Sequence, residues 1–305
     1  MNYLRFKKLL QADNDGTFWP GYIEIPEEVK PKSNIITDKE DNQKIIKNPR
    51  IYTGLGLLLV VSLFFLNKNS ALILLILVAL IATKEWFDLF EFGIVIPFPL
   101  LLYASIAPLL VAYFYGFDNF YVPYFVFPLG VVIYTGTFVS YGIYEKFGSS
   151  YLFLIWFGTG IGSIGYILSN LENMFTYLVL ISVSISDIAA YEFGRRYGKR
   201  KLYERISPNK TIEGFLAGLI FGSFILSVVL YNFLSTNFML AIFLSLIVIT
   251  FGTLGDLFES RIKRSLDVKD SSTFLPGHGG VLDRIDSQLF SFPALVMLLH
   301  FFDLI

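Results

Sequence analysis

The sequence contains no cysteine, and charged side chains make up only 16% of its 305 residues. The lack of cysteine excludes a small module stapled by disulfides. A hydrophobic fraction of 54% excludes a chain that is disordered throughout, and it exceeds what a single soluble domain needs. Because 24 Lys and Arg nearly cancel 25 Asp and Glu, a net charge of −1 gives no general basic surface. We therefore expect no nucleic-acid partner.

Charge is concentrated in the first sixth of the chain. Residues 1–50 carry nine Lys or Arg and eight Asp or Glu, and prolines interrupt any sustained helical period. The segment also lacks the short basic start and apolar core of a signal peptide. The sequence thus predicts two parts, a cytoplasmic and partly disordered arm over 1–50 and a transmembrane domain over 51–305.

Apolar runs long enough to cross a bilayer recur from residue 51 onward. A hydrocarbon core about 30 Å thick needs roughly 17–25 helical residues. Runs such as Leu57–Val61 are apolar on every face, which excludes the alternating pattern of barrel strands. We predict an all-α polytopic membrane protein with about nine transmembrane helices. The expected spans are 51–67, 70–91, 95–116, 120–143, 150–168, 174–193, 212–234, 238–258 and 281–303.

The basic residues predict an orientation, because cytoplasmic connections carry an excess of Lys and Arg. With the arm inside, Lys68 is the only one of 24 Lys and Arg on the outer side. The expected location is the cell (inner) membrane, with a cytoplasmic N-terminus and an external C-terminus. The cytoplasmic connections would be 84–94, 144–150, 194–211 and 259–280.

Acidic residues interrupt three of these spans near their cytoplasmic ends. An ionisable side chain within a span is costly and by default suggests function. The three pairs are Asp187 with Glu192, Asp256 with Glu259, and Asp283 with Asp286. The last pair has i,i+3 spacing, which places both carboxylates on one helix face and favours a divalent cation between them. The alternative is that these are interfacial carboxylates, either solvated or paired with Arg261, Lys263 or Arg264.

The connection that follows the second pair has the residues of a polyphosphate site. It combines basic side chains with glycines and a helix start, which together favour a bound anion. His278 is a candidate phosphate donor there, or else a packing residue of the loop. The basic and glycine members are Lys263, Arg264, Lys269, Gly279 and Gly280.

The connection 194–211 holds seven Lys or Arg within 16 residues. Such a cluster is typical of a patch for anionic lipid. The segment Ser207-Pro208-Asn209-Lys210-Thr211 suggests more, because Pro208 favours a helix start and hydroxyls cap one. We expect this helix start to aim Lys210 at a phosphate.

The stretch Ser260–Asp286 resembles, position by position, the signature of the phosphatidate cytidylyltransferases, also called CDP-diacylglycerol synthases. It reads Ser-x-apolar-Lys-Arg, four residues, Lys-Asp, then apolar-Pro-x-His-Gly-Gly-apolar-x-Asp-Arg-apolar-Asp. The stretch from Asp187 to Gly214 and the pair Glu85-Trp86 are also similar to that family, so the resemblance covers roughly 52–303. It implies an enzyme of phospholipid biosynthesis that transfers CMP from CTP to phosphatidate, giving CDP-diacylglycerol and pyrophosphate.

The resemblance also implies Mg²⁺, held by Asp256 and Asp283 with Asp286 as a third carboxylate, and a second cation beside it is left open. CTP, phosphatidate and membrane lipid are the implied partners, and a homodimer is left open. The expected catalytic residues are Asp256, Asp283, Lys210, Lys263, Arg264 and His278. The expected substrate-binding residues are Asp187, Tyr191, Ser207, Lys210, Thr211, Lys269, Asp270, Gly279, Gly280 and Arg284.

Two other functions compete with this interpretation. A CTP-dependent polyprenol or phytol kinase would handle the nucleotide in a similar way, but the full signature disfavours it. An ion-coupled transporter would place its carboxylates near the bilayer midplane. Here the acidic residues gather at one end of the spans beside basic loops, which argues against conduction.

Overall fold

The computed structural model describes residues 49–90, 96–138, 143–203, 207–275 and 279–305. All of the predicted N-terminal arm except Pro49 and Arg50 lies outside these ranges. The cytoplasmic location and disorder expected of the arm therefore stay predictions.

Helices dominate the described part of the chain, as expected where the surrounding hydrocarbon cannot satisfy backbone hydrogen bonds. The first half contains α2 (Pro49–Phe64), α3 (Lys68–Leu89), α4 (Phe98–Tyr115), η3 (Phe117–Asn119), α5 (Val122–Phe138), α6 (Ile143–Phe153), η4 (Leu154–Gly158) and α7 (Thr159–Asn170). The second half contains α8 (Asn173–Tyr197), β1 (Lys201–Tyr203), β2 (Ser207–Thr211), α9 (Ile212–Leu234), α10 (Phe238–Ser265), α11 (Leu282–Ile285) and α12 (Gln288–Phe301).

The predicted class of all-α membrane protein is confirmed. Within the described ranges, six helical segments are long and apolar enough to cross a bilayer, among them the continuous segment Tyr144–Asn170 formed by α6, η4 and α7. The apolar parts of α2 and α5 are shorter, and α12 has 14 residues. Each predicted span has a helical counterpart, but the count of nine spans stays a prediction.

Two predicted connections are shorter in the structure than expected, because α3 continues to Leu89 and α10 runs on to Ser265. A third prediction, the connection 144–150, is wrong, because these residues lie within α6. With 28 residues, α10 is about 42 Å long, more than the hydrocarbon core of a bilayer. Polar turns can therefore extend a helix beyond the lipid while keeping its backbone hydrogen bonds, so the end of an apolar run did not mark the end of the helix.

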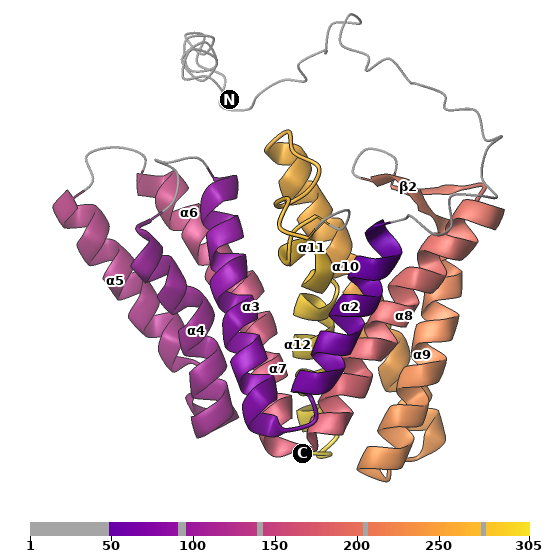
Figure 1. The fold of residues 1–305 in the computed structure, drawn as a ribbon. Helices are drawn as coiled ribbons and strands as arrows, with labels where there is room; N and C mark the ends of the chain where they lie inside the picture. Colours follow the sequence, from indigo (N-terminus) through magenta and orange to yellow (C-terminus); the bar gives the residue numbers. More distant parts are fainter. Residues whose placement is uncertain (1–48, 91–95, 139–142, 204–206, 276–278) are drawn as a thin grey trace, which may run out of the picture. The chain divides into compact units, whose positions relative to one another are not determined.

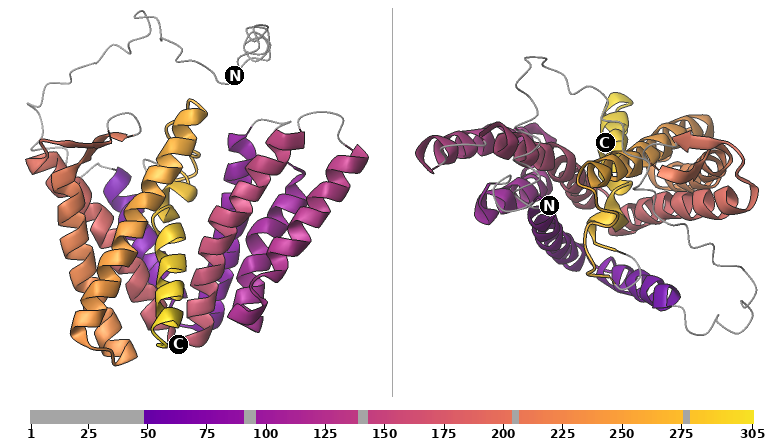
Figure 2. Two further views of the ribbon diagram at one scale, coloured as in Figure 1. Left: turned by 180° about the vertical axis from the view of Figure 1, so that it is seen from behind. Right: turned by 90° about the horizontal axis from the view of Figure 1, so that it is seen from above.

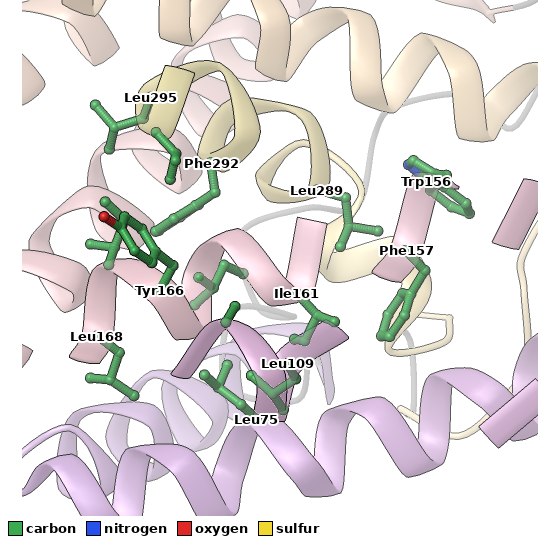
Figure 3. Close-up of a cluster of buried hydrophobic side chains, with 14 of the residues drawn as sticks. Leu75, Leu109, Trp156, Phe157, Ile161, Tyr166, Leu168, Leu289, Phe292 and Leu295 are labelled. Carbon is green, nitrogen blue, oxygen red and sulfur yellow. The ribbon is translucent and has the colours of Figure 1, made fainter. Parts of the chain in front are cut away.

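The core joins α12 to helices on either side of it. Helix α12 packs against both α7 and α10, and α9 packs against α8 and α10. Figure 3 shows Ile161 of α7 between Leu109 of α4 and Leu289 of α12. At Gly255 of α10, an added Cβ would lie 2.5 Å from the Asp286 carbonyl oxygen, so the chain around Asp286 can approach α10 only because this residue has no side chain.

The polar elements of the second half lie at one end of the helices. Figures 1 and 2 show β2 and α11 at this end and the C-terminus at the opposite end. The strands β1 and β2 form a two-stranded antiparallel hairpin, with Lys201 opposite Thr211 and Tyr203 opposite Ser207. The two connections predicted to carry the chemistry therefore lie at the same end of the helices.

Candidate active site

A buried carboxylate from α3 holds the start of α11. Glu85 is only 3% exposed, and its oxygens accept hydrogen bonds from the backbone amides of Val281, at 2.8 Å, and Leu282, at 2.9 Å. The hydroxyls of Ser271 and Ser272 also donate to it, at 3.3 and 2.7 Å. A negative charge is stabilising at a helix start, where amides lack partners within the helix. Glu85 therefore ties the connection after α10 to the end of α3.

Asp283 of α11 also holds the connection between α10 and α11 in place. Its Oδ2 accepts hydrogen bonds from the Ser271 amide at 2.9 Å, the Ser271 hydroxyl at 3.0 Å and the Gly280 amide at 2.7 Å. Its Oδ1 accepts from Lys263 Nζ at 2.5 Å, and Lys263 also donates to Glu259 at 2.8 Å. Lys263 is thus a buried cation between two carboxylates, as the alternative of ion pairing anticipated.

The glycines of the connection allow this close arrangement. Gly279 has a positive φ of 79°, and its carbonyl accepts a hydrogen bond from the Leu275 amide at 2.8 Å. A Cβ on Gly280 would overlap the Ser271 hydroxyl and lie 2.7 Å from the Glu85 carboxylate oxygens. The Gly280 amide, expected to bind a phosphate, is engaged by Asp283 in this structure.

Lys210 lies in the β-hairpin and forms an ion pair with Asp256 of α10. The expected helix start is present, because α9 begins at Ile212 directly after this segment, whereas Ser207–Thr211 itself forms strand β2. The Thr211 hydroxyl caps α9 by accepting a hydrogen bond from the Gly214 amide at 3.1 Å. The segment pairs with β1, and from this hairpin Lys210 reaches Asp256 within α10.

We use the term ionic cluster for the five carboxylates and two lysines that meet at this end. Asp187 of α8 interacts electrostatically with Asp256, Asp286 and Lys210. Asp286 is buried and also contacts the carboxyl of Glu259. The members are Asp187, Asp256, Glu259, Asp283, Asp286, Lys210 and Lys263.

The ionic cluster has more acidic than basic groups, and oxygen ligands are what Mg²⁺ prefers. Within the described ranges, however, no three Asp, Glu or His side chains lie close enough together to hold a metal ion. Asp256 and Asp286 fit a cation by their chemistry. Asp283 has both oxygens engaged, so its use as a ligand would require Lys263 to move.

The remaining predicted residues surround the ionic cluster or lie outside the described chain. Tyr191 on α8 and Arg284 on α11 are exposed, and so are Lys269 and Asp270 after α10. Arg264 donates to the Val268 carbonyl at 3.1 Å, near the end of α10. His278 is outside the described residues. The structure thus brings Asp187, Lys210, Asp256, Lys263, Asp283 and Asp286 together, and their assigned roles stay predictions.

A comparison with known proteins covers the part of the chain that contains the ionic cluster. A sequence model described as "Cytidylyltransferase family" matches residues 48–302, which is most of the chain. The chain belongs to the cytidylyltransferase family.

Among similar members of the cytidylyltransferase family are proteins named phosphatidate cytidylyltransferase. The chain is 46% identical to the protein of Staphylococcus haemolyticus over 149 residues, 48% of this chain and 54% of that protein. It is 50% identical to the protein of Staphylococcus saprophyticus over 128 residues, 41% of this chain and 48% of that protein. For Staphylococcus aureus the identity is 46% over 143 residues, 46% of this chain and 55% of that protein. The chain thus spans about half the length of these relatives.

Sequence reasoning missed three side chains that shape the site of this cytidylyltransferase-family chain. Glu85 was noted only through the resemblance, and Ser271 not at all. Glu259 was noted as an acid in a span but was given no role. A signal existed for the two glutamates, since each is an ionisable residue at the end of an apolar run. For Ser271 no local pattern signals a role, because its partners Glu85 and Asp283 are distant in sequence.

Proposed function

We propose that this chain transfers the cytidylyl group of CTP to phosphatidate, giving CDP-diacylglycerol and pyrophosphate. The observation that supports this most is the ionic cluster, which lies at one end of helices that are long and apolar enough to cross a bilayer. The names of the relatives support the same reaction. A water-soluble nucleotide could reach such a site while the acyl chains of the second substrate stay in the bilayer.

The chemistry needs charge control more than proton transfer. A phosphate monoester has its second pKa near 6, so the headgroup of phosphatidate is a dianion at neutral pH and needs no general base. One of its oxygens forms a bond to the α-phosphorus of CTP, and the bond from that phosphorus to the bridging oxygen of pyrophosphate breaks. The barrier is the approach of two anions, which cationic side chains lower.

Three cations are placed to contact phosphates. Lys210 extends from the hairpin to α10, where its partner is Asp256. Lys269 and Arg264 are exposed at and after the end of α10, on the side open to water. Lys263 is buried between carboxylates, so we assign it to positioning Asp283. Binding of a triphosphate would exchange the pairing of Lys210 with Asp256 for a pairing with phosphate.

A magnesium ion is part of this proposal, with Asp256 and Asp286 as the residues that would hold it. When bound, Mg²⁺ supplies charge neutralisation on the phosphates of CTP. Asp283 remains a predicted third ligand. The exchange of Lys210 from Asp256 to phosphate would free a carboxylate for the cation.

We further propose that the site faces the cytoplasm in an inner membrane. The distribution of Lys and Arg supports this orientation, since the positive-inside rule places basic connections there. Helix α8 ends with Arg195 and Arg196, and the hairpin that follows adds further basic residues.

The decisive experiment is an assay of the purified protein with CTP labelled on the α-phosphate. We expect label in a lipid product with phosphatidate, and none with polyprenol or without lipid. Labelling CTP on the γ-phosphate instead should give labelled pyrophosphate. Transfer of the γ-phosphate to polyprenol would overturn the proposal in favour of a kinase.

A further inference from the structure

A groove lies beside the ionic cluster and is lined almost entirely by apolar side chains. It has a volume of about 500 Å³ and runs between the helical segment 143–170, α10 and α12. This volume is within the range of small-molecule sites. Phe251 and Met297, which line it, are 41% and 69% exposed, so the groove is open on the side where the helices face lipid.

The groove is about as long as one leaflet of the hydrocarbon core is thick. On α10 it extends from Ile247 to Phe258, twelve residues or about 16 Å of helix. On α12 it extends from Leu289 to Leu298, about 14 Å. Half of a hydrocarbon core is about 15 Å. A single extended acyl chain of one leaflet therefore matches the groove in direction and length.

One end of the groove meets the ionic cluster. Phe258 precedes Glu259 of the cluster, and its ring packs against Phe290 with centroids 5.5 Å apart. Phe290 follows Asp286 by one helical turn. An acyl chain lying in the groove would thus enter it beside the carboxylates and lysines assigned to the reacting phosphates.

Trp156 lines the groove and carries a buried polar group, its indole N–H. It is 4% exposed, and among the described residues its indole Nε1 finds no hydrogen-bond acceptor. It belongs to η4, a single π-helical turn, which is an arrangement often found at functional sites. An unpaired buried N–H is costly unless a ligand supplies an acceptor. The ester carbonyl of a glycerolipid is such an acceptor, directly attached to an acyl chain.

We propose that the groove binds one acyl chain of phosphatidate, with Trp156 Nε1 donating to the ester carbonyl of that chain. This inference rests on the proposed function for the identity of the lipid. A bulk phospholipid and a second copy of this chain are the alternatives for an occupant of such a surface. The position of the groove beside the ionic cluster favours the substrate.

Photo-crosslinking tests the proposal without requiring turnover. The probe is phosphatidate with a diazirine at the middle of one acyl chain, and the reference probe is phosphatidylcholine with the same chains. We expect the phosphatidate probe to label peptides containing Phe251 and Met297 at least about fivefold more than the reference probe. Equal labelling by both probes would mean that the groove holds bulk lipid and would overturn the assignment.

Two variants of α12 form a matched pair. Met297→Trp fills the groove, whereas Phe301→Trp places the same ring one turn further on, at a residue that is 79% exposed and outside the groove. Met297→Trp should reduce labelling by phosphatidate and raise its KM several-fold, while the KM for CTP stays unchanged. Phe301→Trp should alter neither. If both variants behave alike, the acyl chain does not bind in the groove.

A second matched pair of variants tests the indole N–H of Trp156. Trp156→Phe keeps the ring but removes the donor, and should reduce labelling about fivefold, the value of one hydrogen bond. Trp86→Phe removes a second buried and unpartnered indole N–H outside the groove, and should leave labelling unchanged. The chains of dihexanoyl phosphatidate are too short to fill the groove. The KM for this lipid should therefore be unchanged by Met297→Trp.

The result can be separated from the proposed function. Selective labelling of the groove without any CMP transfer would support the lipid site and refute the reaction. Transfer without labelling would refute the groove alone. Because the chain has no cysteine, Met297→Cys also provides a clean test for a dimer. A disulfide between two copies at this position would assign the groove to a protein interface and overturn the proposal.

Discussion

The carboxylate of Glu85 accepts a hydrogen bond from the backbone amide of Val281, which lies 196 residues later in the chain, at 2.8 Å. This contact and its neighbour at Leu282 connect the end of α3 to the connection that carries the family signature. The bonds are made by a buried carboxylate, and hydrogen bonds to charged groups are worth about 1.5–3 kcal/mol each. The position of the signature therefore depends on a residue outside it.

Replacing Glu85 with Gln should loosen this connection. The amide group keeps the shape but loses the charge, and its NH₂ would face backbone donors. We expect faster amide hydrogen exchange over residues 271–275 and 279–282 and a rate of CMP transfer reduced at least about tenfold, equal to the loss of about 1.4 kcal/mol or more. Asp88→Asn, one turn later on α3 and exposed, is the control. Unchanged exchange in Glu85→Gln would contradict the assignment.

The ion pair between Lys263 and Asp283 should be visible as a coupling free energy. Both side chains are buried, with exposures of 11% and 5%, and their nearest atoms are 2.5 Å apart. Removing one partner of a buried pair costs about 3–5 kcal/mol, although Glu259 retains one contact to Lys263. Asp283→Asn should therefore destabilise the protein as well as abolish transfer. Lys263→Met should have a similar effect on stability.

The double variant Lys263→Met, Asp283→Asn separates pairing from other roles of Asp283. Its loss of unfolding free energy should be smaller than the sum of the two single losses by about 0.5–3 kcal/mol, measured as thermal or urea unfolding in detergent. Strictly additive losses would show that the pair does not contribute to stability. Near-normal transfer by Asp283→Asn would remove this residue from the site.

Sequence predicted the helical membrane fold because lipid leaves the backbone few choices. An apolar run such as Leu72–Val78 must form internal hydrogen bonds, and a helix does so within one segment. The ends of the helices were less predictable. Residues 84–89 and 259–265 are polar enough to resemble connections, yet both continue as helix, since water and neighbouring side chains can solvate a helical surface equally well.

The separate environments of Asp283 and Asp286 were also beyond sequence reasoning. Their i,i+3 spacing predicted two carboxylates on one helix face sharing a cation. Helix α11 ends at Ile285, however, and Asp283 contacts Lys263 while Asp286 contacts Glu259. The environment of Asp283 depends on hydrogen bonds from Gly280 and Ser271, which belong to the preceding connection and not to α11.

Orientation in the membrane can be tested with single cysteines. Tyr203 of β1 is exposed at the end that carries the ionic cluster, and Ser235 is exposed between α9 and α10. In right-side-out vesicles, an impermeant maleimide should label Ser235→Cys but not Tyr203→Cys, and inverted vesicles should give the opposite result. Labelling of Tyr203→Cys from outside would reverse the proposed orientation.

The proposed magnesium site predicts a cation requirement that depends on Asp286. Chelation should stop transfer, and added Mg²⁺ should restore it. Asp286→Asn should raise the concentration of Mg²⁺ needed by about tenfold or more, and Mn²⁺ binding measured by electron paramagnetic resonance should weaken in parallel. Glu192→Gln is the control, because its partly exposed carboxylate pairs with Arg196 instead. Unaltered Mn²⁺ binding in Asp286→Asn would exclude it as a ligand.

Lys210 and Arg196 separate phosphate binding from attraction to lipid. Lys210 reaches Asp256 in the ionic cluster, whereas Arg196 forms an exposed pair with Glu192 at 3.2 Å. Loss of a phosphate contact at the reacting centre should cost about 1.5–3 kcal/mol, or roughly ten- to a hundredfold in rate. An exposed pair or a basic residue facing anionic lipid is worth only about 1 kcal/mol or less.

We therefore expect Lys210→Ala to lower the maximal rate at saturating phosphatidate far more than Arg196→Ala, with both proteins remaining stable in detergent. Lys210→Arg should recover part of the rate, because the charge is kept while its geometry changes. Equal and mild effects of the two alanine variants would mean that the hairpin only contacts lipid. The phosphates of CTP would then have to be bound by the residues after α10 alone.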